Sequence, residues 1–157
     1  MRRYLIYAFI LVSSGFFLSG LGSAGEVAVV VPELVTDGFT ASLQVEAGIQ
    51  PVGAFEISVY YNPKVISVNQ VLGGKTKEFS RAPITNIDNK EGTVFLTSFQ
   101  ADSLESPTGS VNIANIDFKV LGSSGDKSLI SVEVKRLLDT NGVKIASKPV
   151  SANVTVK

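Results

Sequence analysis

Apolar and polar residues alternate in short runs along most of the chain beyond residue 25, with turn-forming residues between the runs. The clearest run starts at Val52 and stops at Asn62-Pro63. Side chains of a strand point alternately to its two faces, so alternation predicts a strand with one buried face. The expected inner row is Phe55, Ile57, Val59 and Tyr61, and the outer row is Ala54, Glu56, Ser58 and Tyr60.

The same period of two recurs in most of the remaining chain, at 27–31, 39–47, 65–72, 111–120, 129–138 and 150–156. Glycine, proline, asparagine and aspartate separate these runs, as in 122–125 and 139–142. After the first 24 residues, no stretch repeats its apolar residues with a helical period. About nine short strands at regular spacing predict an all-β, antiparallel sandwich or barrel made of one domain.

The segment 93–99 is apolar in both phases, so its pattern does not say which face is buried. Either Val94 and Leu96 face the core and leave Phe95 and Phe99 outside, or the reverse holds. In the first case the two phenylalanines add apolar area to the face that carries Glu56 and predict a binding surface there. Both interpretations stay open at the level of sequence.

The first 24 residues have the layout of an export signal. Arg2 and Arg3 precede an apolar run from Tyr4 to Val12, a softer stretch reaches Leu21, and Gly22-Ser23-Ala24 offers small residues for cleavage. This predicts a helical signal peptide at 1–24, cleaved after Ala24, and a secreted or periplasmic domain at 25–157. The alternative is an uncleaved anchor, since the run to Leu21 is nearly long enough to span a bilayer. We expect no stable membrane insertion unless the leader is kept.

The composition disfavours nucleic-acid binding and catalysis. The 14 basic residues are scattered and balanced by 14 acidic ones, which does not favour nucleic acid, whose phosphates attract clustered Lys and Arg. The chain has no His and no Cys, so none of the usual nucleophile–base pairs can form, and no cofactor motif is present. Any acid could join a hydrolytic pair, but surface solvation explains each of them better: Glu56, Asp88, Asp102, Glu105 and Glu133. We therefore predict a protein that is not an enzyme.

Two groups of oxygen-bearing residues are the only candidates for a calcium site. They are Asn86, Asp88 and Asn89, and Asp139 with Asn141. Neither has a full loop pattern with a terminal bidentate acid, and Asx side chains also favour turns because they cap nearby backbone groups. We interpret both as turns and predict no metal site.

Several segments together resemble the cohesin family, over roughly residues 27–157. In the family order they are Gly53-Ala54-Phe55-Glu56, Tyr61-Asn62-Pro63, Gly92-Thr93-Val94, the run from Ile113 to Val120, Asn141-Gly142 and Val154-Thr155-Val156. The resemblance implies a nine-stranded antiparallel jelly-roll β-sandwich that binds a dockerin-like protein on one sheet face.

The resemblance also assigns candidate residues to that face. Ala54 and Glu56 match positions where family members often carry Asn and Asp; Glu56 keeps a hydrogen-bond acceptor and Ala54 does not. Alternation adds Ser58 and Tyr60, and the first interpretation of 93–99 adds Phe95 and Phe99.

Three functions remain in order of preference. The first is the secreted, non-catalytic module of cohesin type. The second is a carbohydrate-binding module linked to extracellular polysaccharide degradation, disfavoured because Trp is absent and only Tyr60 and Tyr61 follow the leader. The third is a structural protein of the cell envelope.

Overall fold

The computed structural model describes residues 25–100 and 107–157. The predicted leader, as well as Asp102 and Glu105, lies outside these residues. The described chain contains eleven strands and one turn of 3₁₀-helix, η1. In chain order they are β1 (Gly25–Val30), β2 (Leu34–Val35), β3 (Gly38–Glu46), β4 (Val52–Tyr60), β5 (Ile66–Gly73), η1 (Lys77–Phe79), β6 (Ile84–Asp88), β7 (Thr93–Phe99), β8 (Ser110–Val120), β9 (Lys127–Asp139), β10 (Ser147–Val150) and β11 (Ala152–Val156).

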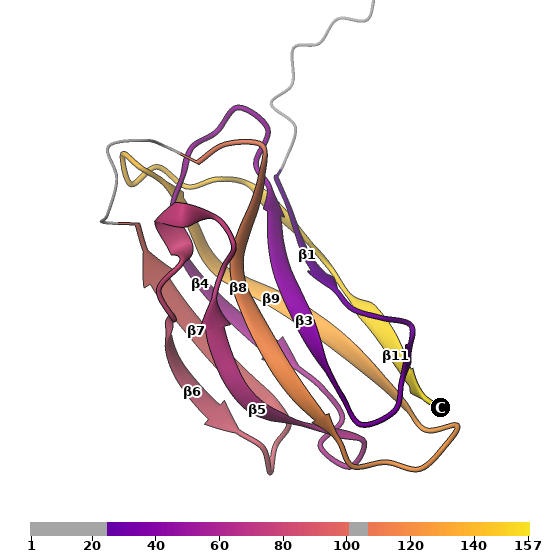
Figure 1. Cartoon of the computed structure of the whole chain (residues 1–157). Helices are drawn as coiled ribbons and strands as arrows, with labels where there is room; N and C mark the ends of the chain where they lie inside the picture. Colours follow the sequence, from indigo (N-terminus) through magenta and orange to yellow (C-terminus); the bar gives the residue numbers. More distant parts are fainter. Residues whose placement is uncertain (1–24, 101–106) are drawn as a thin grey trace, which may run out of the picture.

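The strands form two stacked sheets, with β3, β8 and β5 in the nearer layer of Figure 1 and β4 and β9 behind them. The five-stranded sheet has the order β10-β1-β3-β8-β5, and the six-stranded sheet has the order β2-β11-β9-β4-β7-β6. Among the strands of the described residues, only the β1–β10 and β2–β11 pairs are parallel. The all-β jelly-roll sandwich expected from the sequence is confirmed.

The strand number exceeds the expected nine for two reasons. Both chain ends change sheet: β1 and β10 belong to one sheet, whereas β2 and β11, which follow them directly, belong to the other. The segment 75–86, expected to be polar and half irregular, contains η1 and the start of β6. All five residues of β6 are exposed, so this edge strand has no buried row that a pattern could reveal.

The space between the sheets is filled by aliphatic residues with a few rings. The inner row predicted for β4 is buried, as are most inward-facing residues of β3, β8 and β9, whereas Phe39, Val120 and Val134 are partly buried. Phe55 packs on Phe79 with ring centroids 5.7 Å apart, and Tyr61 meets Phe118 edge-on at 5.3 Å. Such pairs contribute packing energy beyond the area they bury.

The structure resolves the ambiguity of 93–99. Val94 and Leu96 are fully buried, and their pairing partners Val59 and Ile57 belong to the inner row of β4. Phe95 and Phe99 stand opposite Ser58 and Ala54 and face outward.

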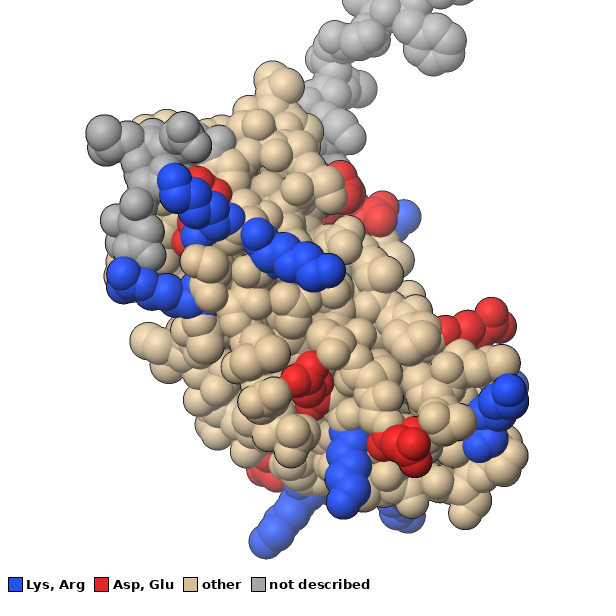
Figure 2. Space-filling view, in the orientation of Figure 1, with Lys and Arg blue, Asp and Glu red and all other residues tan. Residues whose placement is uncertain are grey.

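Figure 2 looks onto β3, β8 and β5, where acidic and basic side chains are scattered and no large area carries one sign of charge. Within the described ranges, no helix is long and apolar enough to cross a membrane.

Candidate functional site: the outer face of the six-stranded sheet

Strands β9, β4, β7 and β6 lie side by side and turn one surface away from the core. Their register decides which side chains share it, because directly paired residues point to the same side. We call this surface the outer face. It consists of Ala54, Glu56, Ser58, Tyr60, Ile84, Asn86, Asp88, Thr93, Phe95, Thr97, Phe99, Ser131, Glu133, Arg136 and Leu138.

All six residues predicted to bind a partner lie on the outer face, but they differ in access. Phe99 is 68% exposed and Tyr60 38% exposed. Ala54, Glu56 and Phe95 are half-buried. Ser58 is only 8% exposed, since the larger side chains beside it cover it. Phe99 and Tyr60 therefore offer more surface to a partner than Ser58 does.

An irregularity in β9 brings two further residues onto the outer face. Ile57 pairs with Val134 but Glu56 pairs with Arg136, so Lys135 is an extra residue in β9. A bulge of this kind changes which face the following side chains point to. Arg136 and Leu138 consequently face outward, beside Glu56 and Ala54, while Leu137 is buried. Alternation alone places Arg136 and Leu138 on the inner side, so it does not predict either residue on the outer face.

Three charged side chains of the outer face, Glu56, Arg136 and Glu133, have side-chain partners. Arg136 Nη1 lies 3.1 Å from Glu56 Oε1. The Tyr60 hydroxyl donates to Glu133 Oε2 at 2.6 Å, and Lys135 Nζ donates to Glu133 Oε1 at 2.8 Å. The hydrogen bonds from Lys135 and then Tyr60 hold the pKa of Glu133 below its usual value, and the bond to Glu133 raises the pKa of Lys135. These pairs hold the side chains of the outer face in fixed orientations.

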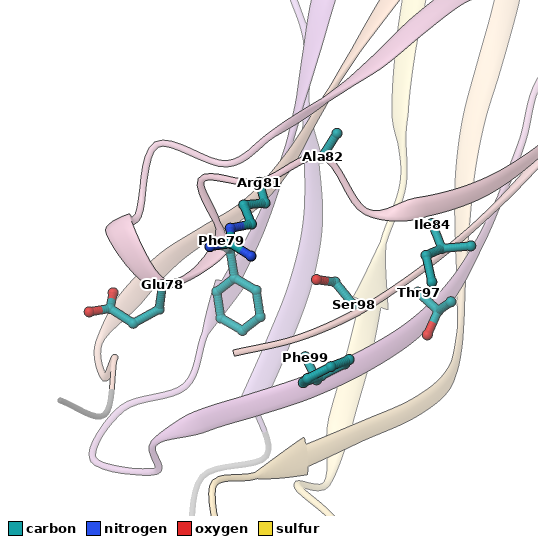
Figure 3. A pocket seen from close by; sticks show the side chains of 8 residues that line it. All are labelled: Glu78, Phe79, Arg81, Ala82, Ile84, Thr97, Ser98 and Phe99. Carbon is teal, nitrogen blue, oxygen red and sulfur yellow. The ribbon is translucent and has the colours of Figure 1, made fainter. Parts of the chain in front are cut away.

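The outer face ends at Phe99 in two hollows. The first, of about 230 Å³, lies beyond the start of β6 and is lined by Glu78, Phe79, Arg81, Ala82, Ile84, Thr97, Ser98 and Phe99 (Figure 3). The second, of about 190 Å³, lies over β4 and is lined by Ala54, Phe55, Glu56, Thr97, Ser98, Phe99, Arg136 and Leu138. We call them the β6 hollow and the β4 hollow.

One aspartate from each group considered for calcium caps a turn, whereas Asn86 lies in strand β6. Asp88 Oδ1 accepts from the backbone N–H of Lys90 and of Glu91, at 3.0 and 3.1 Å. Asp139 Oδ1 accepts from the N–H of Asn141 and of Val143, both at 2.8 Å. Within 25–100 and 107–157, no three His, Cys, Asp or Glu residues gather in a way that could hold a metal ion.

The Tyr61-Asn62-Pro63 motif has a structural place next to the outer face. The N–H of Tyr61 donates to the carbonyl of Gly92 at 2.9 Å, and the N–H of Asn62 donates to Ser128 Oγ at 3.0 Å. The motif thus joins the ends of β4, β7 and β9, which fixes the register on which the outer face depends.

Comparison with known proteins agrees with this architecture. The model of the cohesin domain family matches residues 34–157, which is most of the chain. No curated protein sequence matches this chain.

Solved cohesin structures share the fold at low sequence identity. A type I cohesin–dockerin complex from Clostridium thermocellum contains a chain that is 14% identical, with a TM-score of 0.72 over 85% of this chain and 99% of that one. A non-cellulosomal cohesin from Archaeoglobus fulgidus is 13% identical, with a TM-score of 0.69 over 86% and 92%. The cohesin module of a family 33 glycoside hydrolase from Clostridium perfringens is 16% identical, with a TM-score of 0.70 over 85% and 97%. The sandwich, its register and the family match together place this chain in the cohesin domain family.

Proposed function

We propose that this protein is a non-catalytic recognition module whose outer face binds a dockerin-type protein partner. The observation that carries the proposal is the family match over 34–157, and cohesins of the same fold are found in complexes with dockerins. A cohesin fold serves binding, and a chain without His or Cys lacks the usual means of nucleophilic catalysis.

The chemistry of the outer face supports this role. It is part of a rigid sheet, so little conformational entropy is lost when a partner docks. It offers hydrogen-bonding groups on Tyr60, Glu56 and Arg136, and one end offers the exposed ring of Phe99. Apolar anchors beside polar groups are typical of protein interfaces.

Binding to a panel of purified dockerin domains, measured by titration calorimetry, tests the proposal. Glu56→Arg breaks the 3.1 Å pair and places two cations side by side on the outer face. We expect it to weaken binding at least about tenfold, equivalent to about 1.4 kcal/mol. Glu26→Arg is the matched control, because Glu26 is an exposed acid on β1 of the other sheet.

Three outcomes would count against the proposal. Equal affinities for the Glu56→Arg and Glu26→Arg variants would show that the outer face is not the binding surface. If none of the dockerin domains in the panel binds, the proposed dockerin-type partner is wrong. Retention on insoluble polysaccharide instead would favour the carbohydrate-binding alternative.

We further propose that the domain acts outside the cytoplasm, as the export signal expected at 1–24 implies. Intact-mass measurement of the protein recovered outside the cytoplasm should give a chain that starts at Gly25. A chain that retains residues 1–24 in the membrane fraction would favour the anchor.

A further inference from the structure

Phe99 forms a ridge between two hollows. Its side chain lines both the β6 hollow and the β4 hollow, and it is 68% exposed. Ile84, on the far side of the β6 hollow, is 74% exposed. In Figure 3 the ring of Phe79 lies to the left of Ser98, the ring of Phe99 lies below it, and Ile84 is on the right. Two large apolar side chains this exposed and this close form a surface that a partner is expected to cover.

Sheet geometry explains why both hollows exist. The β6–β7 ladder ends at the pair Ile84–Thr97, whereas β7 continues to Phe99. The last residues of β7 therefore have no β6 neighbour, which leaves the β6 hollow above the buried ring of Phe79. On the other side, Ala54 is the small residue between Phe99 and Leu138, and its missing side-chain volume leaves the β4 hollow.

We propose that Phe99 and its two hollows form the anchoring subsite, and that the protein partner lays an apolar side chain of leucine or phenylalanine size into each hollow. This inference rests on the proposed function, which it makes more specific. A cavity of about 150 Å³ lined by apolar residues holds benzene, so hollows of about 230 and 190 Å³ are large enough.

The local charges favour apolar groups over a carboxylate or an ammonium group. The charged groups lining the β4 hollow, Glu56 and Arg136, already neutralise each other at 3.1 Å. The β6 hollow is lined by one acid and one base, Glu78 and Arg81. Because the charges among the described lining residues balance, we expect the apolar rings to provide the contact, and binding through them should depend little on salt.

The experiment measures affinity for a dockerin at low and high salt. Phe99→Ala should weaken binding at least about tenfold, as for a central aromatic residue of an interface. Leu121→Ala is the control, since Leu121 is similarly exposed at the end of β8, next to Val65 and away from both hollows. Ala54→Leu and Ala82→Leu fill one hollow each and should also weaken binding, with circular dichroism unchanged.

A second measurement does not need a dockerin. Titration of the ¹⁵N-labelled protein with benzyl alcohol should shift the amide signals of Ser98, Phe99 and Ile84, and the Ala54→Leu and Ala82→Leu variants should reduce these shifts. If benzyl alcohol shifts these signals but no dockerin binds in the affinity experiment, the subsite is supported and the proposed function is rejected. No shifts at these residues would overturn the subsite.

The remaining outcomes also discriminate. If Phe99→Ala binds as well as wild type while Glu56→Arg binds weakly, the outer face is correct and the anchoring subsite is wrong. If sedimentation shows a dimer of this protein that Phe99→Ala dissociates, the hollows are covered by a second copy, which overturns the assignment to a different protein.

Discussion

Replacing Asn89 with alanine should destabilise the whole sandwich, although Asn89 lies in an exposed turn. Its side chain connects three strands: Asn89 Oδ1 accepts from the Tyr61 hydroxyl at 2.6 Å and from the N–H of Val68 at 2.8 Å, and Asn89 Nδ2 donates to the carbonyl of Val68 at 3.0 Å. Tyr61 follows β4, Val68 lies in β5, and Asn89 follows β6, so the side chain ties the two sheets together.

The size of the destabilisation depends on the polar groups of Tyr61 and Val68 that lose their partner. Each neutral hydrogen bond contributes about 1 kcal/mol, and an unpaired buried group costs more. Tyr61 and Val68 are almost fully buried, whereas water reaches the exposed side of Asn89. Since water can replace part of the loss, we expect the free energy of unfolding to fall by about 2 kcal/mol. For a domain of this size, that lowers Tm by roughly 5–10 °C.

Denaturant unfolding followed by circular dichroism measures the change, with Asn86→Ala as control. Asn86 is an exposed residue of β6, so its replacement should change the free energy of unfolding by less than about 0.5 kcal/mol. Thermal unfolding measured with calcium chloride and with a chelator tests whether Asp88 and Asn89 instead bind calcium. We expect the same Tm in both, because Asp88 and Asn89 are engaged by backbone and tyrosine groups.

Two results would refute this reasoning. A loss below about 0.5 kcal/mol for Asn89→Ala would show that water replaces the connection between the sheets at no cost. A Tm that rises with calcium in wild type, and not in the Asn89→Ala variant, would show that Asn89 is a metal ligand.

Two further predictions concern the backbone and the charges near the outer face. Gly92→Ala should lower the free energy of unfolding by more than about 2 kcal/mol, because φ is 70° and an added Cβ would collide with the carbonyl oxygen of Tyr61. Gly142→Ala is the control and should lower it by only about 1 kcal/mol, because Gly142 has φ 80° but open space around it. Equal losses for the two variants in denaturant titrations would contradict the predicted collision at Gly92. The lowered pKa of Glu133 gives stability that is present above its unfolded value of 4.5 and is lost as pH falls through the lower folded value. Glu133→Gln should therefore reduce the fall of Tm at acidic pH and low salt. If Tm falls equally in the variant and the wild type, Glu133 is not the source of this pH dependence.

The sequence was sufficient where one face of a strand is buried. In β4 the apolar row Phe55, Ile57 and Val59 could only face the core, so the outward direction of Glu56 and Tyr60 followed from alternation. The same argument could not orient β7, where Val94 and Phe95 both suit a core. Nor could it find β6, an edge strand without a buried residue.

The candidate site depended on pairing between distant parts of the chain. The extra residue Lys135 in β9 turns Arg136 and Leu138 outward, and no local pattern announces it. The exposure of Phe99 and the near-complete burial of Ser58 likewise depend on neighbours in β4, β7 and β9.

The amino-acid sequence by itself determined that the chain forms an antiparallel sandwich, because a period of two and the turn residues are local properties of each segment. The cohesin family was indicated separately, by the motifs that resemble it. The tertiary structure decided which phenylalanines face solvent, where Arg136 meets Glu56, and that hollows flank Phe99. These features arise from the register between strands far apart in the chain, and a shift of one residue in that register would move every side chain to the opposite face.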